Sequence, residues 1–409
     1  MWFCVFRLPP SVLRITGYIM QLEYTEQQNA FRKEVRAWLA ANVPTEPLQS
    51  FDTELGFQQH REWEAKLYEG RWGMITWPEE MGGRGADLLQ WLIFEEEYYA
   101  ARAPLRVNQN GIFLLGPTLM EYGTDEQKKR FLNGMATGKD IWCQGWSEPD
   151  AGSDMAAIRS TATLSEDGSH YIINGQKTWS TRAVWADWCF GMFRTDPASE
   201  RHKGLTFILV PLETEGITVR PIPQLDGLPG FAEIFFDNVK VPVDCRLGGE
   251  GEGWNVAMAT AGFERGLMLR SPARFQETAK RLVNLYKANQ ESADQDPAVR
   301  DAVLRAYMDA EAYALTTYQT ACRLIQGGKI GAEASTNKIF WSELDQQMHG
   351  LGLKILGARA ELLPHAPDAG EVGSWLDGWL FAQSGPIYAG TNEIQRNIIA
   401  ERLLGMPRK

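Results

Sequence analysis

Residues 142–154 read WCQGWSEPDAGSD, and the pattern of the sequence changes at this stretch. Before it, from Thr25 onward, apolar residues recur at helical spacing, as in AFRKEVRAWLAANV (30–43). After it, to about residue 250, short runs rich in β-branched and aromatic residues are bounded by Gly, Pro and Asp. The stretch therefore marks the passage from a helical domain to a β-domain.

Two capping boxes support the helical domain. Thr25-Glu26-Gln27-Gln28 and Thr124-Asp125-Glu126-Gln127 each place a Thr three residues before a Gln, the pattern that begins a helix. Between them, DLLQWLIFEEEYYAARA (87–103) repeats the helical spacing and carries three consecutive acids. The region up to residue 142 is therefore predicted to be helical.

The middle region predicts a small antiparallel β-domain. Asn174-Gly175, inside HYIINGQKTWS (170–180), stands between apolar flanks and is the strongest short signal for a hairpin. Three further β-rich runs follow: GLTFILVPL (204–212), GITVRPI (216–222) and EIFFDNVKVP (233–242).

Helical spacing returns near Trp254. Four long segments, at roughly 252–290, 297–327, 330–359 and 391–404, are enough for a four-helix bundle. The predicted fold is mainly α with a β-domain. Its parts are an N-terminal helical domain (20–142), a middle antiparallel β-domain (143–251) and a C-terminal helical bundle (252–409). Residues 1–19, apolar with two arginines and no acids, read as a targeting peptide or as an overlong start before an initiator Met20.

Composition excludes several classes of function. The net charge of -11 argues against a nucleic-acid partner, and no apolar run reaches the ~20 residues of a membrane span. The five cysteines are scattered without a CxxC motif, which indicates reduced thiols and a cytoplasmic protein. The five histidines lack metal-ligand spacing, so no metal site is expected.

Two loops of the β-domain offer a site for a planar ligand. The stretch 142–154 combines an amide, two tryptophans, hydroxyls and glycines, and KTWSTRAVWADW (177–188) adds a tryptophan next to two hydroxyls. Each could also be a structural turn with a core tryptophan. Together they indicate a planar heteroaromatic cofactor. The Gly-rich stretches MGGRGAD and GGEGEGW do not match the GxGxxG pattern of a Rossmann nucleotide site.

Three motifs in this order resemble the acyl-CoA dehydrogenase flavoprotein family: GWSEPDAGSD (145–154), KTWST (177–181) and IYAGTNEIQR (387–396). The likeness extends from about residue 22 to the end of the chain. It implies the same three-part fold, usually assembled as a tetramer, and FAD as cofactor. The resemblance also implies which residues contact FAD: Gln144, Trp146, Ser147, Trp179, Ser180, Thr181, Thr391 and Glu393.

The reaction that the resemblance implies is α,β-dehydrogenation of an acyl-CoA thioester, with an electron-transfer flavoprotein as acceptor. It needs a base for the α-proton. Many family members carry a glutamate where this chain has Ala389, which cannot accept a proton. Other members carry the base on the first helix of the C-terminal domain, where this chain reads AGFERGLMLR (261–270). Glu264 is therefore the expected base, and the implied substrate contacts are Ser153, Arg265, Ala389 and Gly390.

Two differences from the family motifs leave the cofactor binding and the type of subunit open. Where many relatives hold the FAD diphosphate with an Arg and a Phe-Gly pair, this chain reads RLVNLYKANQESADQDP (281–297), and QQMHGLGLKILG (346–357) only loosely matches a second FAD motif. The chain could therefore form a homotetramer, or be a non-catalytic or half-site subunit of a heterotetramer with a related protein. A related flavin oxidase or monooxygenase is a further alternative. The space left by Ala389 predicts a branched or bulky acyl group.

Overall fold

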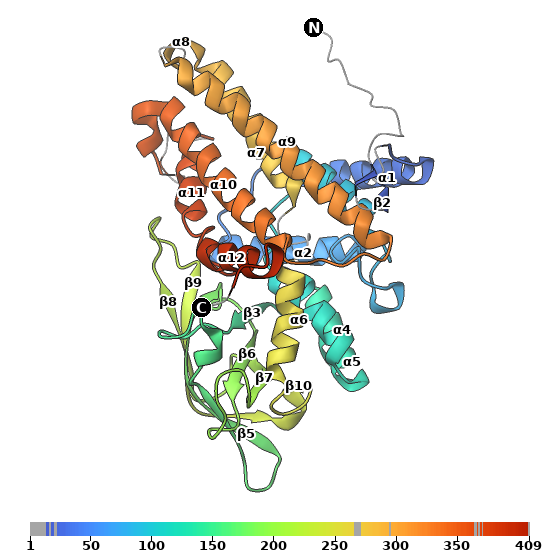
Figure 1. Cartoon of the computed structure of the whole chain (residues 1–409), viewed down its shortest axis with the longest axis vertical. Coiled ribbons are helices and arrows are strands. Elements are labelled where there is room, and N and C mark those ends of the chain that lie inside the picture. The colour runs from blue at the N-terminus through green and yellow to red at the C-terminus, as the bar shows by residue number, and fades with distance from the viewer. Residues whose placement is uncertain are drawn as a thin grey trace.

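The computed structural model describes residues 14–15, 18–19, 23–265, 271–293, 296–363, 366, 369 and 371–407, with the backbone alone described at 14–15, 18–19 and 263–265. Helices come first along the chain, a β-sheet follows, and helices return (Figure 1). The sheet occupies one end of the molecule and the long later helices occupy the other. The fold class predicted from the sequence is confirmed.

The N-terminal helices begin where the sequence predicts. Thr25 and Thr124 both complete capping boxes, each accepting the backbone N–H of the glutamine three residues later. Two short strands, β1 (Arg14–Ile15) and β2 (Tyr18–Ile19), pair before the first helix. The helices that follow are α1 (Glu26–Asn42), α2 (Glu54–Glu69), the 3-10 turn η1 (Glu79–Met81), α3 (Leu88–Ala100), the π-helix η2 (Asn110–Leu115), α4 (Gly116–Tyr122) and α5 (Asp125–Ala136).

One sheet forms the middle of the chain, in the strand order β10-β7-β6-β4-β5-β9-β8, with β3 joined to β6. Most pairings are antiparallel, as predicted, but β6 pairs parallel with β3 and, at one position, with β4. The strands are β3 (Trp142–Gly145), β4 (Thr161–Leu164), β5 (His170–Thr181), β6 (Trp188–Arg194), β7 (Leu205–Pro211), β8 (Ile217–Ile222), β9 (Phe231–Pro242) and β10 (Arg246–Leu247); the 3-10 turns η3 (Met155–Ala157) and η4 (Val243–Cys245) accompany them.

The predicted hairpin at Asn174-Gly175 is wrong, because β5 runs through both residues. The register between β5 and β9 shifts here, with an extra residue on β9 next to Asn238 (φ 52°). The side chain of Asn174 accepts the backbone N–H of Asn238 at 2.8 Å, so its polar group is satisfied across the sheet rather than in a turn. A Cβ on Gly175 would collide with the side chain of Ser160, so the glycine serves a close approach between strands.

The later helices differ in number from the four segments predicted. The first predicted segment contains two helices, and the Ser271-Pro272 pair begins the second of them, with Pro at the first helical position. A short apolar helix before the last segment was not predicted. The observed elements are α6 (Gly253–Arg265), α7 (Pro272–Ala288), α8 (Gln290–Ala293), α9 (Pro297–Ile325), α10 (Ala334–Leu356), the 3-10 turn η6 (Gly357–Glu361), α11 (Gly373–Ala382), α12 (Asn392–Ile398) and the π-helix η7 (Ile399–Leu403).

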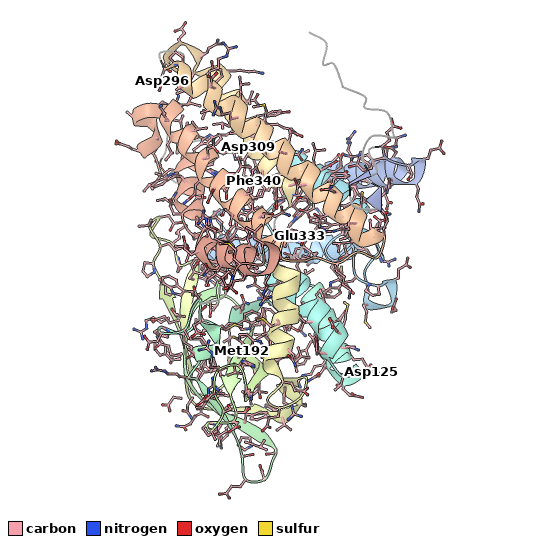
Figure 2. All side chains as sticks on the ribbon, in the orientation of Figure 1. Asp125, Met192, Asp296, Asp309, Glu333 and Phe340 are labelled. Atoms are coloured by element: carbon pink, nitrogen blue, oxygen red, sulfur yellow. The ribbon has the colours of Figure 1, made fainter. Side chains whose placement is uncertain are left out.

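Three apolar clusters hold these parts together, and the side chains in Figure 2 fill the space between the ribbons. One cluster joins the sheet to η2, α4, α5 and α6. A second joins α1, α2 and α3 and includes Ala321 and Cys322 of α9. The third lies within the bundle, between α7, α9, α10 and α11. The helical domain therefore packs against both the sheet and the bundle.

None of the helices in the described part of the chain is both long and apolar enough to cross a lipid bilayer. Four of the five cysteines, at positions 143, 189, 245 and 322, are described, and each is a buried free thiol.

Asn108 connects the helical domain to the sheet. Its side chain is fully buried and donates to the carbonyls of Met135 (2.9 Å) and Asp140 (3.0 Å), and it accepts the N–H of Trp142 at 3.1 Å. These three backbone groups lie at the end of α5, in the connection that follows it, and at the first residue of β3. One amide therefore fixes where β3 starts.

Replacing this amide tests that role. Asn108→Ala removes the Asn108 hydrogen bonds of the Asp140 carbonyl and the Trp142 N–H and one of the bonds of the Met135 carbonyl, so we expect the free energy of unfolding to fall by about 3 kcal/mol or more. Urea unfolding followed by circular dichroism measures the change. Asn133→Ala is the control, because the Asn133 side chain meets Tyr68 at an exposed site, and its effect should stay within about 0.5 kcal/mol. Equal losses in the two variants would contradict the assigned role.

Candidate functional site

Gln144 lies in strand β3, which carries the chain into the loop that holds Trp146 and Ser147. Gln144 and Ser147 are half-buried, whereas Trp146 is buried with its ring edge-to-face against Phe190 and Phe207. The indole N–H of Trp146 is buried and has no hydrogen-bond partner among the described residues. The Trp146 ring therefore anchors the loop to the sheet through Phe190 and Phe207. Its N–H is a polar group that the described residues leave without a hydrogen-bond partner.

Glu148, which the sequence reading did not single out, fixes this loop. Its carboxylate accepts a hydrogen bond from the ammonium group of Lys177 at 2.7 Å and from the backbone N–H groups of Arg159 (2.7 Å) and Ser160 (2.9 Å). The Lys177 side chain is fully buried and also donates to the carbonyl of Met192, which Figure 2 labels in the β-domain. Glu148 in one motif is thus bound to Lys177 in the other.

Each residue of the pair shifts the pKa of the other toward its charged form. Burial alone would raise the pKa of Glu148, but the Lys177 charge and the hydrogen bonds from Arg159 and Ser160 outweigh it and hold that pKa below its ordinary value. Burial lowers the pKa of Lys177 against the opposing pull of Glu148. A backbone bond from the N–H of Thr178 to the carbonyl of Ser147, at 2.9 Å, adds a second link between the two motifs.

A bulge in β5 presents Trp179 to solvent. Between Lys177 and Ser180 the register with β9 shifts by one extra residue on β5, and Trp179 adopts a φ of 58°. A left-handed backbone is strained for a residue with a large side chain. The indole is 60% exposed and touches Phe231 edge-to-face at 6.1 Å between ring centroids. The bulge therefore exposes a flat aromatic ring on the strand that binds Ser147 and Glu148 of the preceding loop.

Ser180 and Thr181 follow at the end of the strand. Ser180 is fully buried, and its hydroxyl has no hydrogen-bond partner among the described residues. Thr181 is half-buried, so its side chain is partly open to solvent. Ser153, in contrast, is exposed in the 146–154 loop, next to the exposed ion pair of Asp154 with Arg201.

The C-terminal motif forms a rigid turn on α10. Ala389 (φ 56°) and Gly390 (φ 79°) are both left-handed, and the side-chain amide of Gln395 donates to their carbonyls at 3.0 and 3.3 Å. The backbone N–H groups of the two residues make no backbone hydrogen bond within the described part of the chain. Two aromatic contacts of Tyr388, with Trp341 and Phe381, seat the turn on the bundle.

Thr391 and Glu393 make their contacts within α12 itself. The Thr391 hydroxyl caps the helix by accepting the N–H of Ile394 at 3.2 Å, and Glu393 is exposed and pairs with Arg396 at 3.6 Å. Asn392 anchors the helix by accepting the ammonium group of the buried Lys338 at 2.8 Å. Thus the structure joins the two β-domain motifs directly, whereas the described contacts of Thr391 and Glu393 stay local.

Glu264 and Arg265 end α6, and their side chains lie outside the described residues. The described part of α6 contacts β7, η2 and α4. One turn before Glu264, the buried Thr260 hydroxyl lies 3.0 Å from the hydroxyl of Thr118 on α4. No group of three or more His, Cys, Asp or Glu side chains in the described part of the chain is placed to hold a metal ion.

Family profiles of the acyl-CoA dehydrogenases match the chain in the expected order: the N-terminal domain over residues 25–139, the middle domain over 143–239 and the C-terminal domain over 251–404. The chain belongs to the acyl-CoA dehydrogenase family. Members of this family are oxidoreductases. The resemblance found in the three sequence motifs is confirmed.

Relatives within the family extend over almost the whole chain. Acyl-CoA dehydrogenase IpdE1 of Mycobacterium tuberculosis is 39% identical over 93% of this chain and 98% of its own length. The ChsE4–ChsE5 complex of Mycobacterium tuberculosis superposes with a TM-score of 0.78 at 31% identity, covering 95% of this chain and 100% of that one. A Tcur3481–Tcur3483 steroid acyl-CoA dehydrogenase superposes with a TM-score of 0.85 at 28% identity, over 95% and 100%.

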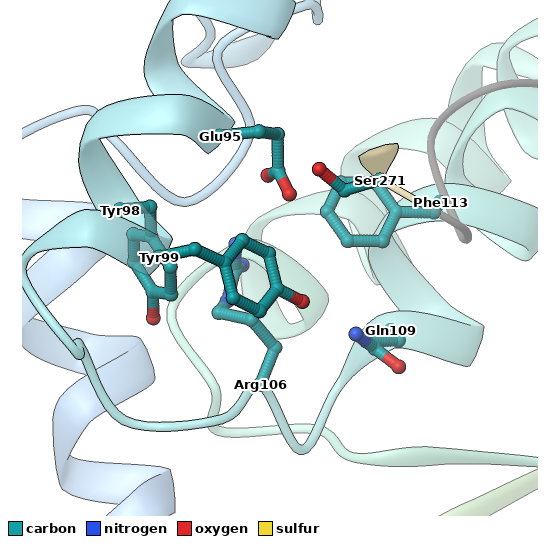
Figure 3. A pocket seen from close by; sticks show the side chains of 7 residues that line it. All are labelled: Glu95, Tyr98, Tyr99, Arg106, Gln109, Phe113 and Ser271. Atoms are coloured by element: carbon teal, nitrogen blue, oxygen red, sulfur yellow. The ribbon is translucent and has the colours of Figure 1, made fainter. Parts of the chain in front are cut away.

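A second polar site of this acyl-CoA dehydrogenase lies beside α3. Figure 3 shows it lined by Glu95, Tyr98, Tyr99, Arg106, Gln109, Phe113 and Ser271. Burial raises the pKa of Glu95 to about 7, against smaller lowering effects of Ser271 and Arg106. The sequence showed three consecutive acids at 95–97 but could not distinguish among them.

The buried ion pair of the loop gives a first test. Glu148→Ala leaves the Lys177 charge fully buried without its partner, so we expect the free energy of unfolding to fall by about 3–5 kcal/mol. Asp150→Ala is the matched control in the same loop, because Asp150 is exposed and its pairing with Arg159 is 4.0 Å long. Chemical denaturation measures both. A control that loses as much stability as Glu148→Ala would contradict the assignment.

Glu95 gives a pH-dependent test. Its folded pKa of about 7 lies above its ordinary value of 4.5, so the folded state binds the proton more tightly. Stability that is present at low pH is therefore lost between pH 4.5 and about 7. Glu95→Gln removes this loss, so its stability relative to the natural protein should rise by about 3 kcal/mol from pH 5 to pH 8.

The neighbouring acid supplies a control of opposite sign. Although burial pushes the pKa of Glu97 upward, its bonds with Arg36 and Arg32 hold that pKa below the ordinary value. Its contribution is therefore present at neutral pH and lost as the pH falls. Glu97→Gln should consequently be most destabilising at pH 8. Melting curves of Glu95→Gln and Glu97→Gln, recorded at a series of pH values, measure whether the two pH dependences have opposite signs. Parallel pH profiles for the two variants would refute the raised pKa of Glu95.

Proposed function

We propose that the protein is an FAD-dependent dehydrogenase that oxidises the Cα–Cβ bond of an acyl-CoA thioester, with Glu264 as the base. The observation that carries the proposal is the strained bulge in β5 that exposes Trp179. Lys177 and Thr178 of the same strand bind the loop that follows Gln144 and contains Trp146 and Ser147. Strain that is kept while it exposes an aromatic ring is typical of a ligand site.

The residues present fit the ring of FAD. Trp179 offers an exposed aromatic face, and Gln144, Ser147 and Thr181 offer half-buried polar groups around it. The buried Ser180 hydroxyl and the Trp146 indole N–H lack partners among the described residues. In this proposal Trp179 stacks on the isoalloxazine, while Ser180 and Thr181 lie near its redox-active nitrogen. Thr391 and Glu393 contact the dinucleotide part.

The chemistry of the chain's own groups follows from the proposal. The Glu264 carboxylate takes the proton from the α-carbon. When bound, FAD supplies the two-electron acceptor for the hydride that leaves the β-carbon. As the α-proton is removed, negative charge develops on the thioester oxygen, where the backbone N–H of Ala389 would donate to it, and this charge is lost as the hydride leaves and the Cα=Cβ bond forms. Support comes from the turn: Gln395 holds the Ala389 carbonyl, and the Ala389 N–H makes no backbone bond to the described residues.

The choice of Glu264 rests on two facts. Ala389 has no group that accepts a proton, and α6 packs against η2 and α4 through the buried contact of Thr260 with Thr118. Glu264 lies one helical turn beyond Thr260 on α6, at the place where the resemblance puts the base of some family members. Arg265 and the exposed Ser153 would contact the CoA part and the thioester, with Gly390 beside them.

The remaining parts of the proposal concern substrate and acceptor. The missing carboxylate at Ala389 leaves room beside the α-carbon, which favours a branched or bulky acyl group. We propose an electron-transfer flavoprotein as acceptor because of the family resemblance, and the cytoplasm as location because the cysteines are scattered and those described are free thiols.

A second candidate is a half-site role in a mixed tetramer. Residues 281–297 contain Arg281 but no Phe-Gly to complete the pair expected at the FAD diphosphate. They form the end of α7, α8 and the start of α9, with 294–295 outside the described residues. A structural relative, ChsE4–ChsE5, is a complex. In this case the protein purified alone would be colourless and would gain flavin only with a related subunit.

Glu264→Gln tests the reaction. The natural protein should be yellow, alone or with its partner subunit, and a suitable acyl-CoA should bleach it. In Glu264→Gln the colour should remain and the rate of bleaching should fall by about 10²–10⁴-fold, because only proton abstraction is removed. Stopped-flow absorbance at the flavin band measures the rate. Glu121→Gln, an exposed acid on α4, is the control and should keep the natural rate.

Three results would overturn parts of the proposal. Full bleaching by Glu264→Gln would reject this base. A protein without flavin even beside a related subunit would reject the cofactor. Oxygen consumption that matches flavin reduction, without an added acceptor, would favour an oxidase or monooxygenase.

A further inference from the structure

The polar pocket beside α3 has no role in the chemistry proposed above. The pocket is lined from α3 by Glu95, Tyr98 and Tyr99 (Figure 3). Arg106 and Gln109 precede η2, Phe113 lies within it, and Ser271 stands just before α7. The free space at its centre is small, on the order of one water molecule or one functional group.

Two of the polar residues in the pocket already form hydrogen bonds with groups outside it. The Arg106 guanidinium donates to Glu64 and to the carbonyl of Gly73, each at 2.8 Å. The Tyr98 hydroxyl accepts the indole N–H of Trp63 and donates to the carbonyl of Pro104, both at 2.6 Å. Both side chains therefore have hydrogen-bond partners without a group bound in the pocket.

Glu95 and Ser271 are different. Both are more than nine-tenths buried, and Figure 3 shows their oxygen atoms directed into the pocket. The Ser271 hydroxyl has no partner of good hydrogen-bond geometry among the described residues, although it lies near enough to Glu95 to lower that carboxyl's pKa. The Gln109 amide points into the same space. Three hydrogen-bonding groups thus converge on a small space that no side chain of the described residues fills.

Glu95 is also the exception among three consecutive acids. Glu96 and Glu97 both form ion pairs with Arg32, at 2.6 and 2.8 Å. Among the described residues Glu95 forms no such ion pair, and Arg106, whose charge acts on its carboxyl, is held by Glu64. A buried acid without a structural partner costs free energy and is typical of a binding site.

The position of the pocket connects it to the proposed reaction. Ser271 lies seven residues after Glu264 (264 to 271), and α6 packs against η2, which begins next to Gln109. On the other side, Arg274 interacts electrostatically with Tyr99 and with Tyr388, the residue before Ala389. The pocket is therefore connected to the helix of the proposed base through η2, and to the turn before Ala389 through Arg274.

We propose that Glu95 determines substrate specificity by hydrogen bonding to an oxygen on the far end of the acyl group. The inference rests on the proposed function. The substrate class is a CoA thioester whose acyl group is bulky and carries a ketone or hydroxyl remote from the thioester. A neutral carboxyl donates to such an oxygen, and Ser271 and Gln109 complete the contact. An unsubstituted hydrocarbon would leave all three groups without partners, which strongly disfavours its binding.

A matched pair of thioesters tests this: 3-(4-oxocyclohexyl)propanoyl-CoA and 3-cyclohexylpropanoyl-CoA, which differ by one oxygen. The natural protein, with its flavin and any partner subunit, should bind the oxo compound at least ~10-fold more tightly by calorimetry. Its kcat/KM for flavin reduction should show the same preference, mainly through KM. Glu95→Leu should abolish the preference in both measurements, and Glu95→Gln should retain part of it, because an amide still donates.

Glu96→Gln is the matched control on the same helix and should keep the full preference. Infrared difference spectra give an independent readout: binding of the oxo compound should shift a neutral carboxyl band that Glu95→Gln lacks. Melting curves verify that all three variants fold, and Glu95→Gln still decides the question if Glu95→Leu does not fold.

The outcomes separate this inference from the proposed function. Equal affinity for the two thioesters, or a preference that survives in Glu95→Leu, overturns the role of Glu95, and the pocket then holds only a structural water. Failure of every thioester to reduce the flavin, with the affinity difference intact, overturns the proposed reaction and leaves the recognition by Glu95 standing.

Discussion

The buried ion pair between Glu148 and Lys177 is the interaction on which the candidate site depends. Glu148 lies in the loop after β3 and Lys177 in strand β5, 29 positions later in the sequence, and their contact ties the tryptophan-bearing loop to the strand that carries Trp179. Such a pair does not by itself make a protein more stable than an apolar contact would. Its value here is positional, since the carboxylate also holds two backbone N–H groups and so allows one loop conformation only.

Domain order was predictable from the sequence because helix caps and apolar spacing are local signals. Thr25 and Thr124 begin their helices as predicted, since a cap needs only the next three residues. The Asn174-Gly175 signal failed because the partner of Asn174, the backbone of Asn238, is 64 residues away. The bulge at Trp179 was missed for the same reason: it arises from the register with β9. No local pattern reports such a register.

The acids illustrate the same limit at the level of the site. Nothing in the letters EEE distinguishes Glu95 from its neighbours. Only the arrival of Arg32 from α1, more than sixty residues earlier, neutralises Glu96 and Glu97 and leaves Glu95 facing a cavity. Carboxyl groups with the same chemistry thus differ in pKa, which is raised at Glu95 and lowered at Glu97, because their surroundings differ. The resemblance could suggest Glu264, which matches a motif, but not Glu95, which matches none.

The exposure of Trp179 has an optical consequence. Among the tryptophans that the structure describes, it is the one most open to solvent, whereas Trp146, Trp142 and Trp91 are buried. Its emission should therefore lie at the long-wavelength edge of the protein's intrinsic fluorescence. A coloured ring stacked on it would quench that component first. The side chain held in the most strained backbone of the site is thus also a natural fluorophore through which occupancy can be read without a label.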